Sequence, residues 1–358
     1  MESIVLIQEA VGIDVSKSTL SWGYCGMYAD LRKNYLPGED VGNDLKGFKE
    51  LLKALSRISK SKSIVFVLEA TGVYHEKLVY YLHGLGLKVV LMQSGRARRY
   101  AQSLDQRSKT DALDSRMLSM IGCERELTAW TPPSEGLQEL RFLSRERSAL
   151  IKERTVEKNR NHANERSVFN STKAKIRYQM RMKLLNKQLE EIENEMEQVI
   201  KMDEELSRKI KFIESIPAVS TVTATIVIAE TSGFSLFTNA KQLTSFCGYD
   251  IVLKESGTYK GQSKMSKKGN KHIRAALYMP ALTAVRVNPT LKPFYERLKP
   301  KKAKPMVAVV AVQRKLLCLM YSLWKNECYY DAEFEQKKVA RVNALATQDR
   351  VKNEFETS

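Results

Sequence analysis

Acidic side chains stand at positions where apolar strand residues would be expected. Asp14 lies within the apolar run VGIDVS, and Glu69 ends the apolar run VFVLEA. Asp111 and Asp114 are three residues apart in KTDALD, so a helix would project both from one face. Four carboxylates from two strands and a helix can hold two divalent cations against a phosphodiester. A structural role fits the same residues, since a strand Asp is often hydrogen-bonded internally and an acid pair often lies on a solvated helix face.

A serine lies near the start of the most basic segment. The run from Lys254 to Arg274 holds seven Lys or Arg and one Glu, and Ser256-Gly257 is near its head. One interpretation is a loop that contacts phosphates, and the other is that Ser256 attacks one. A serine hydroxyl needs a base or a metal to become a nucleophile, and no histidine is close to it in sequence. The acid set is one source of that help, and a phosphoserine link to DNA would suit recombination rather than degradation.

Basic residues flank both groups and are expected to contact phosphates. Those near the acids are Arg96, Arg98, Arg99 and Lys109, and those around the serine are Lys260, Lys264, Lys267, Lys268, Lys271 and Arg274. Gly257 and Gly261 would let the backbone approach a phosphate closely. Such contacts read no bases, so the choice of sequence would have to come from elsewhere.

Composition limits the class of protein. The 358 residues carry a formal net charge of +18, which favours nucleic acid as the partner. No apolar run approaches the roughly 18 residues that a spanning helix needs, so no membrane partner is expected. The N-terminus lacks a basic region before its apolar residues and does not resemble a signal peptide. Scattered Cys and His residues predict a reduced cytoplasmic protein without a zinc site, so a bound metal would be Mg²⁺ or Mn²⁺.

Hydrophobic patterning predicts an α/β domain over residues 1–130. Three strands are expected within residues 4–37, followed by a helix from Asn43. Two buried strands, at 63–70 and 88–93, are expected to alternate with a helix at 73–83 and basic helices as far as residue 124. This is the element order of a ribonuclease-H-like sheet, and the fold name rests on analogy.

The remainder is predicted to be helical. The segment TAWTPPSEG at 128–136 is the clearest boundary, because it holds two prolines and a glycine. An antiparallel coiled-coil arm is expected over 131–213, broken near 169–174, with an apolar heptad that begins at Leu185 and has polar Asp203 where one apolar residue is missing. A mostly helical C-terminal domain with Ser256 is expected over 214–330, and a polar tail over 331–358.

An ordered set of motifs resembles the IS-one-ten (IS110) family of insertion-sequence transposases, also called DEDD transposases. The motifs are GIDVSK, LEATGVYHEKL, AQSLDQRSKTDALDSRML, the IP–TA segment, FCGYDIVLKESG and SKKGNKHIRAALYMPA, and they span roughly residues 10 to 330. By motif match, the resemblance implies metal-binding acids at Asp14, Glu69, Asp111 and Asp114, and a nucleophilic serine at Ser256. It further implies a RuvC-like domain, a coiled-coil arm and a transposase domain.

The resemblance also implies partners. They are donor and target DNA, a structured guide (bridge) RNA, and further copies of the chain, as a dimer that assembles into a tetramer with composite active sites. A bacterial or archaeal protein acting in the cytoplasm is expected. One departure is that the family often has IPGIG where this chain has IPAVS, with Ala218 and Ser220. If that turn needs a left-handed glycine, its local geometry differs here.

Two other functions remain open from the sequence. A junction-resolving nuclease would use only the acids, with water as its nucleophile, and would form no protein–DNA adduct. A non-catalytic RNA-binding protein would keep the fold, and substitutions of its carboxylates would change stability alone. The preferred hypothesis is an Mg²⁺-dependent DNA transposase or recombinase with covalent chemistry at Ser256.

Overall fold

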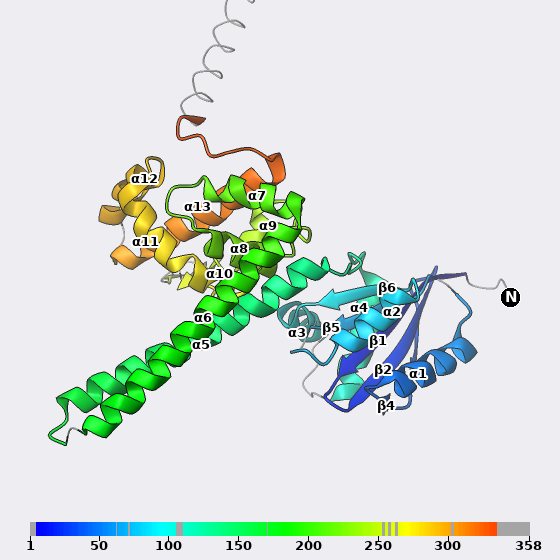
Figure 1. The fold of residues 1–358 in the computed structure, drawn as a ribbon. Helices are drawn as coiled ribbons and strands as arrows, with labels where there is room; N and C mark the ends of the chain where they lie inside the picture. Colours follow the sequence, from blue (N-terminus) through cyan, green and yellow to red (C-terminus); the bar gives the residue numbers. More distant parts are fainter. Residues whose placement is uncertain are drawn as a thin grey trace, which may run out of the picture. The chain divides into compact units, whose positions relative to one another are not determined.

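The structure is a computed structural model, and it describes residues 5–61, 63–70, 72–104, 110–169, 171–252, 255–256, 259–261, 264–301 and 304–334. The chain divides into two compact units, Met1–Pro132 and Pro133–Ser358. Figure 1 shows the sheet of the first unit and the helices of the second.

The first unit is built on one mixed β-sheet (Figure 1). Its strands are β1 (Leu6–Val15), β2 (Thr19–Tyr28), β3 (Lys33–Pro37), β4 (Val41–Gly42), β5 (Val65–Glu69) and β6 (Lys88–Met92). The order is β3-β2-β1-β5-β6, with β4 paired to β2. β2 is antiparallel to β1 and β3, whereas β1, β5 and β6 are parallel. The predicted α/β sheet is confirmed.

Helices cover both faces of this sheet. They are α1 (Leu45–Ile58), α2 (Glu76–Gly84), α3 (Ser94–Ser103) and α4 (Asp111–Glu124). Odd-numbered residues of β1, such as Val11 and Ile13, share a core cluster with side chains of α1 and α2. Ala10 belongs to a second cluster with side chains of α3 and α4. Because side chains alternate along a strand, even-numbered β1 residues face α4.

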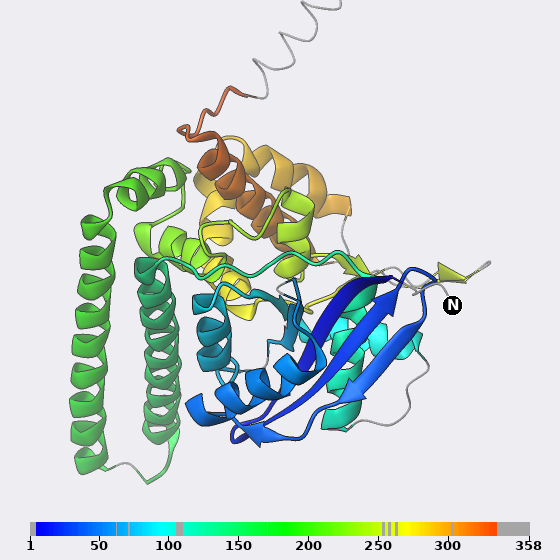
Figure 2. The same cartoon turned by 90° about the vertical axis from the view of Figure 1, so that its right-hand side faces the viewer.

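The second unit begins with two long helices, α5 (Glu135–Arg166) and α6 (Thr172–Met202), which run side by side in Figure 2. The apolar residues of α6 that are buried include Leu185 and Leu189. The heptad pattern suggested that this helix continues beyond residue 203. Instead Asp203 separates α6 from α7 (Glu204–Glu214), because its carboxylate accepts a hydrogen bond from the Leu206 amide at 2.9 Å and caps the new helix.

The rest of the second unit packs around one apolar core. Its helices are α8 (Thr221–Glu230), α9 (Ala240–Phe246), α10 (Lys271–Ala276), α11 (Tyr278–Val287), α12 (Leu291–Leu298) and α13 (Pro305–Asn326), with one 3-10 turn at Lys299–Lys301. Helix α13 is long and apolar enough to cross a membrane, but its buried face, including Val312 and Leu316, belongs to this core. Core helices of water-exposed proteins pass the same test of length and hydropathy. Most of the predicted tail, from residue 335, lies outside the described residues.

Candidate active site

Asp14 and Glu69 stand at the ends of adjacent parallel strands. The register of β1 and β5 pairs Gly12 with Val67 and Ile13 with Leu68. One further step along that register places Asp14 beside Glu69. Both side chains are half-buried. Asp14 is two residues after Gly12 and Glu69 is two residues after Val67, so each acid lies on the same face of the sheet as that earlier residue. The two carboxylates therefore share one end and one face of the sheet.

Helix α4 brings the other two acids to the same end. A Cβ atom on Gly12 would lie 2.0 Å from the Ser115 carbonyl oxygen, and one on Gly122 would lie 2.6 Å from the Ala10 Cβ. The helix therefore runs antiparallel to β1 in direct backbone contact. Two strand residues advance roughly 6.6 Å, which equals about four residues of helix. Two residues beyond Gly12 on the strand, Asp14 therefore lies beside the first turn of α4. That turn holds Asp111 and Asp114.

The first turn of α4 is built to start at Asp111. The Thr110 hydroxyl accepts a hydrogen bond from the Leu113 amide at 3.2 Å and caps the helix. Acids in a first turn are also stabilised by the helix dipole, so this position alone does not require a metal. Asp111 is exposed and Asp114 is half-buried. These two residues thus combine a local structural advantage with a place beside the strand acids.

The donor chemistry suits a hard divalent cation. All four predicted ligands are carboxylates, which Mg²⁺ and Mn²⁺ prefer over the nitrogen and sulfur donors of zinc sites. However, among the described residues, which include all four acids, no three His, Cys, Asp or Glu side chains are gathered closely enough to hold a metal ion. The strands and α4 therefore place the four acids at one end of the sheet, but their carboxylates do not converge on a single point.

Three predicted basic residues lie at this same end of the sheet. Glu69 pairs with Met92, the last residue of β6, and α3 begins two residues later. Ala97 and Tyr100 anchor α3 on the face that α4 covers. The side chains that remain exposed on α3 include Arg96, Arg98 and Arg99. Lys109 lies outside the described residues.

In the second unit, Ser256 lies near the tip of a β-hairpin. Strands β7 (Ile251–Val252) and β10 (Lys264–Met265) pair at the base, and β8 (Glu255–Ser256) pairs with β9 (Tyr259–Lys260) further out. Ser256 is opposite Tyr259 and its side chain is exposed. Lys260 and Lys264 occupy strand positions, and their side chains lie outside the described ones.

The segment after the hairpin is fixed to the end of α9. The Lys267 amide donates to the Gly248 carbonyl at 3.1 Å, and the Asn270 amide donates to the Phe246 carbonyl at 2.9 Å. Gly269 has φ +155°, and a Cβ there would lie 2.3 Å from the Phe246 oxygen. This stem presents three predicted phosphate contacts as exposed residues, namely Lys267, Lys268 and Lys271. Arg274 is half-buried and donates to the Cys247 carbonyl at 2.8 Å, so it also holds the stem in place.

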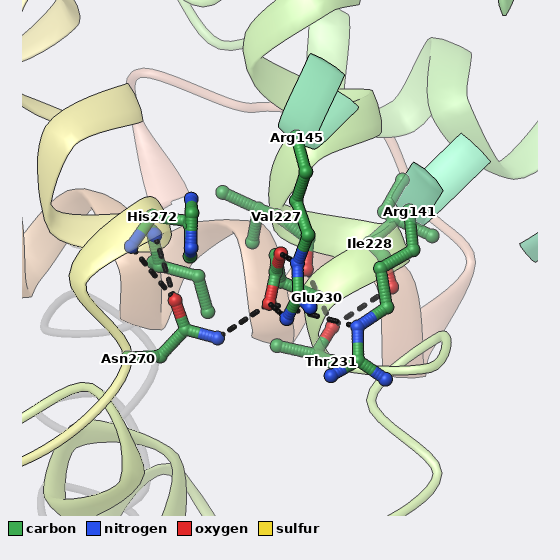
Figure 3. Close-up of polar contacts among 9 residues, drawn as sticks. Arg141, Arg145, Val227, Ile228, Glu230, Thr231, Asn270 and His272 are labelled. Carbon is green, nitrogen blue, oxygen red and sulfur yellow. Dashed lines mark hydrogen bonds and ion pairs between the residues drawn. The ribbon is translucent and has the colours of Figure 1, made fainter. Parts of the chain in front are cut away.

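Sequence reasoning did not single out Glu230, the last residue of α8. Its side chain is fully buried. Arg145 donates to both of its carboxylate oxygens, at 2.7 and 3.1 Å, and the Asn270 amide donates to one at 2.6 Å (Figure 3). Burial would raise the pKa of this carboxyl, but these hydrogen bonds and the charge of Arg141 hold the pKa below its ordinary value. The signal in the sequence was an acid directly after the apolar run TIVIA.

Two family models define the class of protein as a transposase. The DEDD transposase model of the IS110 group matches residues 11–169, and the model described as "Transposase IS116/IS110/IS902 family" matches residues 210–296. Together they cover more than half of the sequence and both candidate sites. The chain belongs to the IS110 family of transposases, which are DNA recombination enzymes.

Curated relatives agree with this assignment. The chain is 26% identical over 333 residues to the pilin gene-inverting protein of Moraxella bovis, covering 91% of this chain and 98% of that one. The protein of the same name from Moraxella lacunata matches equally. An uncharacterized 42 kDa protein of insertion element IS900 from Mycobacterium paratuberculosis is 24% identical over 124 residues, covering 34% of this chain and 31% of that one.

A solved structure, Thermus thermophilus RuvC in complex with a Holliday junction substrate, is also similar. It shares 12% sequence identity and a TM-score of 0.26, covering 32% of this chain and 91% of the RuvC chain.

Proposed function

We propose that the chain is an RNA-guided, Mg²⁺-dependent DNA recombinase that cleaves and rejoins strands through a phosphoserine–DNA intermediate at Ser256. What supports the proposal is the convergence of Asp14, Glu69, Asp111 and Asp114 on one end and one face of the sheet, in a chain of a DNA-transposase family. The exposed hydroxyl of Ser256 at a hairpin tip supports the covalent step.

The four acids are proposed to hold Mg²⁺, or Mn²⁺. Such a cation, when bound, neutralises phosphate charge and favours deprotonation of an attacking hydroxyl. The residues of the chain have separate tasks. The acids hold their place through the contact of α4 with β1, and the arginines of α3 are positioned to orient the substrate backbone. Closing the four side chains together is expected to accompany cation binding, because like charges brought close together repel one another.

The proposed covalent step conserves phosphoester bonds. The Ser256 Oγ forms a bond to the phosphorus, and the bond from phosphorus to one deoxyribose oxygen breaks. The serine proton passes to a carboxylate of the acid set, and the leaving deoxyribose oxygen takes up a proton from water. Reversal by a different DNA hydroxyl rejoins strands without an external energy source. The acids lie in the first unit and Ser256 lies in the second.

A guide RNA and further copies of the chain complete the proposal. The exposed lysines of the hairpin stem are suited to backbone phosphates, which carry no sequence information. Delegating sequence choice to base pairing is a known solution for proteins that read mainly the backbone. Each copy of the chain contributes one acid set and one Ser256, so a homodimer that assembles into a tetramer would hold several of each.

Trapping the adduct tests the proposed chemistry. A plasmid carrying the gene with its native flanking DNA is incubated with protein, Mg²⁺ and RNA transcribed from those flanks, and detergent-resistant protein–DNA adduct and recombined product are measured. Ser256→Ala and Asp14→Asn should each remove both signals. Ser235→Ala, which alters another exposed serine of the same unit, should leave both unchanged. Cleavage by Ser256→Ala without adduct would instead establish a nuclease that uses water.

Site-specific inversion is a second candidate arrangement of the same chemistry. The relatives named pilin gene-inverting protein match nearly their whole length. Excision and inversion differ in the relative orientation of the two recombining sites, and the bonds broken are the same. A plasmid with the flanking DNA cloned in inverted orientation would yield an inverted segment if the chain acts in this way, and only intermolecular products if it does not.

A further inference from the structure

The Glu230 cluster joins three helices of the second unit. Glu230 ends α8, Arg141 and Arg145 come from α5, and Asn270 directly precedes α10. Figure 3 shows the two arginines and Asn270 approaching the carboxylate from different sides. Asn270 also caps α10, because its side-chain oxygen accepts hydrogen bonds from the amides of His272 at 2.9 Å and Ile273 at 3.1 Å. The start of α10 is therefore held at a fixed place beside α5.

Positive charge exceeds negative charge at this junction. Arg141, Arg145 and Lys152 are four and seven residues apart along α5, so they follow one face of the helix. Lys271 adds a further cation from α10, and the buried partner of the group is the single carboxylate of Glu230. Lys152 and Lys271 are both exposed, and neither forms an ion pair with a carboxylate of the described residues.

His272 lies within this group, and the charges of the group affect the pKa of its imidazole. Burial lowers the pKa of the His272 imidazole. The Glu230 carboxylate from α8 opposes that effect, whereas Arg145 and Lys152 from α5 and Lys271 from α10 lower the pKa further. Contacts also place these groups: Arg145 and Asn270 bond the same Glu230 carboxylate, Lys271 follows Asn270, and Lys152 lies two turns beyond Arg145 on α5. Among the described residues, Glu230 is the one carboxylate that opposes these cations at the ring, and Glu153 and Glu157 lie near Lys152 further along α5, so a bound anion beside the ring would offset the positive charge.

We propose that the junction of α5 and α10 is a phosphate-binding site for a nucleic-acid backbone, in which Lys152 and Lys271 contact the phosphate, Glu230 positions Arg145 beside them, and His272 is a further donor. Lys271 also belongs to the stem of the Ser256 hairpin, whereas Lys152, Arg145 and His272 lie in neither the acid set nor that hairpin. The proposal rests on nucleic acid as the partner of this transposase, and it is independent of the covalent chemistry proposed for Ser256.

Salt dependence of binding tests the two lysines. Fluorescence anisotropy with a labelled DNA duplex, and in parallel with a labelled RNA hairpin, gives the affinity over a range of salt. Each lost phosphate contact lowers the slope of log affinity against log salt by about 0.9 on a duplex and about 0.7 on a single strand. Lys152→Gln combined with Lys271→Gln should therefore lower the slope by the amount expected for the loss of about two phosphate contacts. The decrease should be seen with the nucleic acid that binds at the site.

A matched double variant separates a site from bulk charge. Lys49→Gln combined with Lys53→Gln removes the same charge from two exposed positions of α1. It should leave the slope within error of wild type. Equal slopes for the two double variants would overturn the proposal. A lower slope with DNA alone or with RNA alone identifies the nucleic acid that binds at the site. Ser256→Ala should keep the wild-type slope whether or not the serine is the nucleophile.

The role of His272 is tested by pH. A neutral His272 that becomes protonated on contact with phosphate makes binding tighten as pH falls from 7.5 to 5.5. The tightening should be several-fold greater in wild type than in His272→Gln, after melting curves show that the variant is folded. The groups that face the ring, Glu230, Arg145, Lys152 and Lys271, stay in place in both proteins. Identical pH dependence in both proteins would exclude His272 from the site.

Discussion

Gly12 and Ser115 are in direct backbone contact, so close that a Cβ on residue 12 would lie 2.0 Å from the Ser115 carbonyl oxygen. The same added atom would lie 2.3 Å from the Ser119 amide nitrogen. Neither obstacle is a flexible side chain, so helix α4 can pack against β1 at this distance only if residue 12 has no side chain. The contact lies two strand residues before Asp14 and fixes where α4 begins relative to it.

Gly12→Ala should therefore displace α4 and disturb the acid set. Overpacking against backbone is expected to lower the free energy of unfolding by about 3 kcal/mol, at the upper end of the usual range. Chemical denaturation measures that change, and recombination assays at a temperature where the variant is folded should show reduced activity. Gly84→Ala is the control, because a Cβ at Gly84 meets nothing within 4 Å. It should be neutral or stabilising, and an equally mild Gly12→Ala would contradict the close contact.

Divalent cations should stabilise the chain through the acid set. A ligand that binds only the folded state at a hundred times its Kd stabilises by about 2.7 kcal/mol. Melting curves in rising Mg²⁺ are expected to shift upward for wild type and to stay unchanged for Asp14→Asn, which removes one charged ligand. Glu50→Gln, on α1 and away from the α4 face, should retain the wild-type shift. A shift that survives in Asp14→Asn would place the cation elsewhere.

Sequence patterning predicted the longer strands and the helical segments of the first unit and the strand positions of Asp14 and Glu69, but it missed the two-residue strand β4. Alternation and apolar runs depend on local burial, which a single chain records directly. The contact of α4 with β1 could not be predicted in this way. It depends on Gly12, Ser115 and Gly122 fitting together in space, and nothing in their local sequence sets the register of a strand against a helix that follows about a hundred residues later.

The Glu230 cluster shows the same limit more sharply. Each of its members is ordinary in its own segment, with Arg145 in a charged helix and Asn270 in a basic run. Only the fold brings these residues to one buried carboxylate. Asp203 illustrates a local competition instead, because its side chain caps a helix and so interrupts an apolar heptad that otherwise continues.

Glu230→Gln should weaken the cluster that supports α10. The neutral amide cannot satisfy Arg145 as a bidentate carboxylate does, although the arginines are partly exposed and water replaces some of the loss. A decrease of about 2 kcal/mol in the free energy of unfolding is expected by denaturant titration. Glu205→Gln, which alters an exposed acid paired with Lys209, should leave the free energy of unfolding nearly unchanged, because solvent screens an exposed ion pair.

The stability that Glu230 contributes should depend on pH in a defined direction. Its pKa in the folded chain is below its ordinary value of 4.5, so the unfolded chain binds more protons in that range. The contribution is complete above pH 4.5 and is lost as pH falls toward the folded pKa. Acid titration of stability should therefore be less steep below pH 4.5 in Glu230→Gln than in wild type, and equal slopes would contradict the assigned pairing.

Ala218 occupies a position that glycine would fill with less strain. It has φ +85°, it follows Pro217, and the Val219 amide donates to the Ile216 carbonyl at 3.0 Å, which fits a type II turn with Ala218 at the left-handed position. Here the departure from the IPGIG motif places a Cβ where the backbone disfavours one. The left-handed conformation costs a residue with a side chain roughly 1–2 kcal/mol. Glycine avoids this cost, but its greater conformational entropy in the unfolded chain offsets part of the gain in stability.

Ala218→Gly should therefore raise the free energy of unfolding by about 1 kcal/mol, measured by denaturant titration. Ala54→Gly in the regular helix α1 is the matched substitution, and it should lower stability by about 0.5–1 kcal/mol, because glycine is unfavourable within a helix. Opposite signs for the same chemical change isolate the effect of backbone conformation. If both variants lose stability, the methyl group of Ala218, which packs against the apolar core, outweighs the strain of its turn.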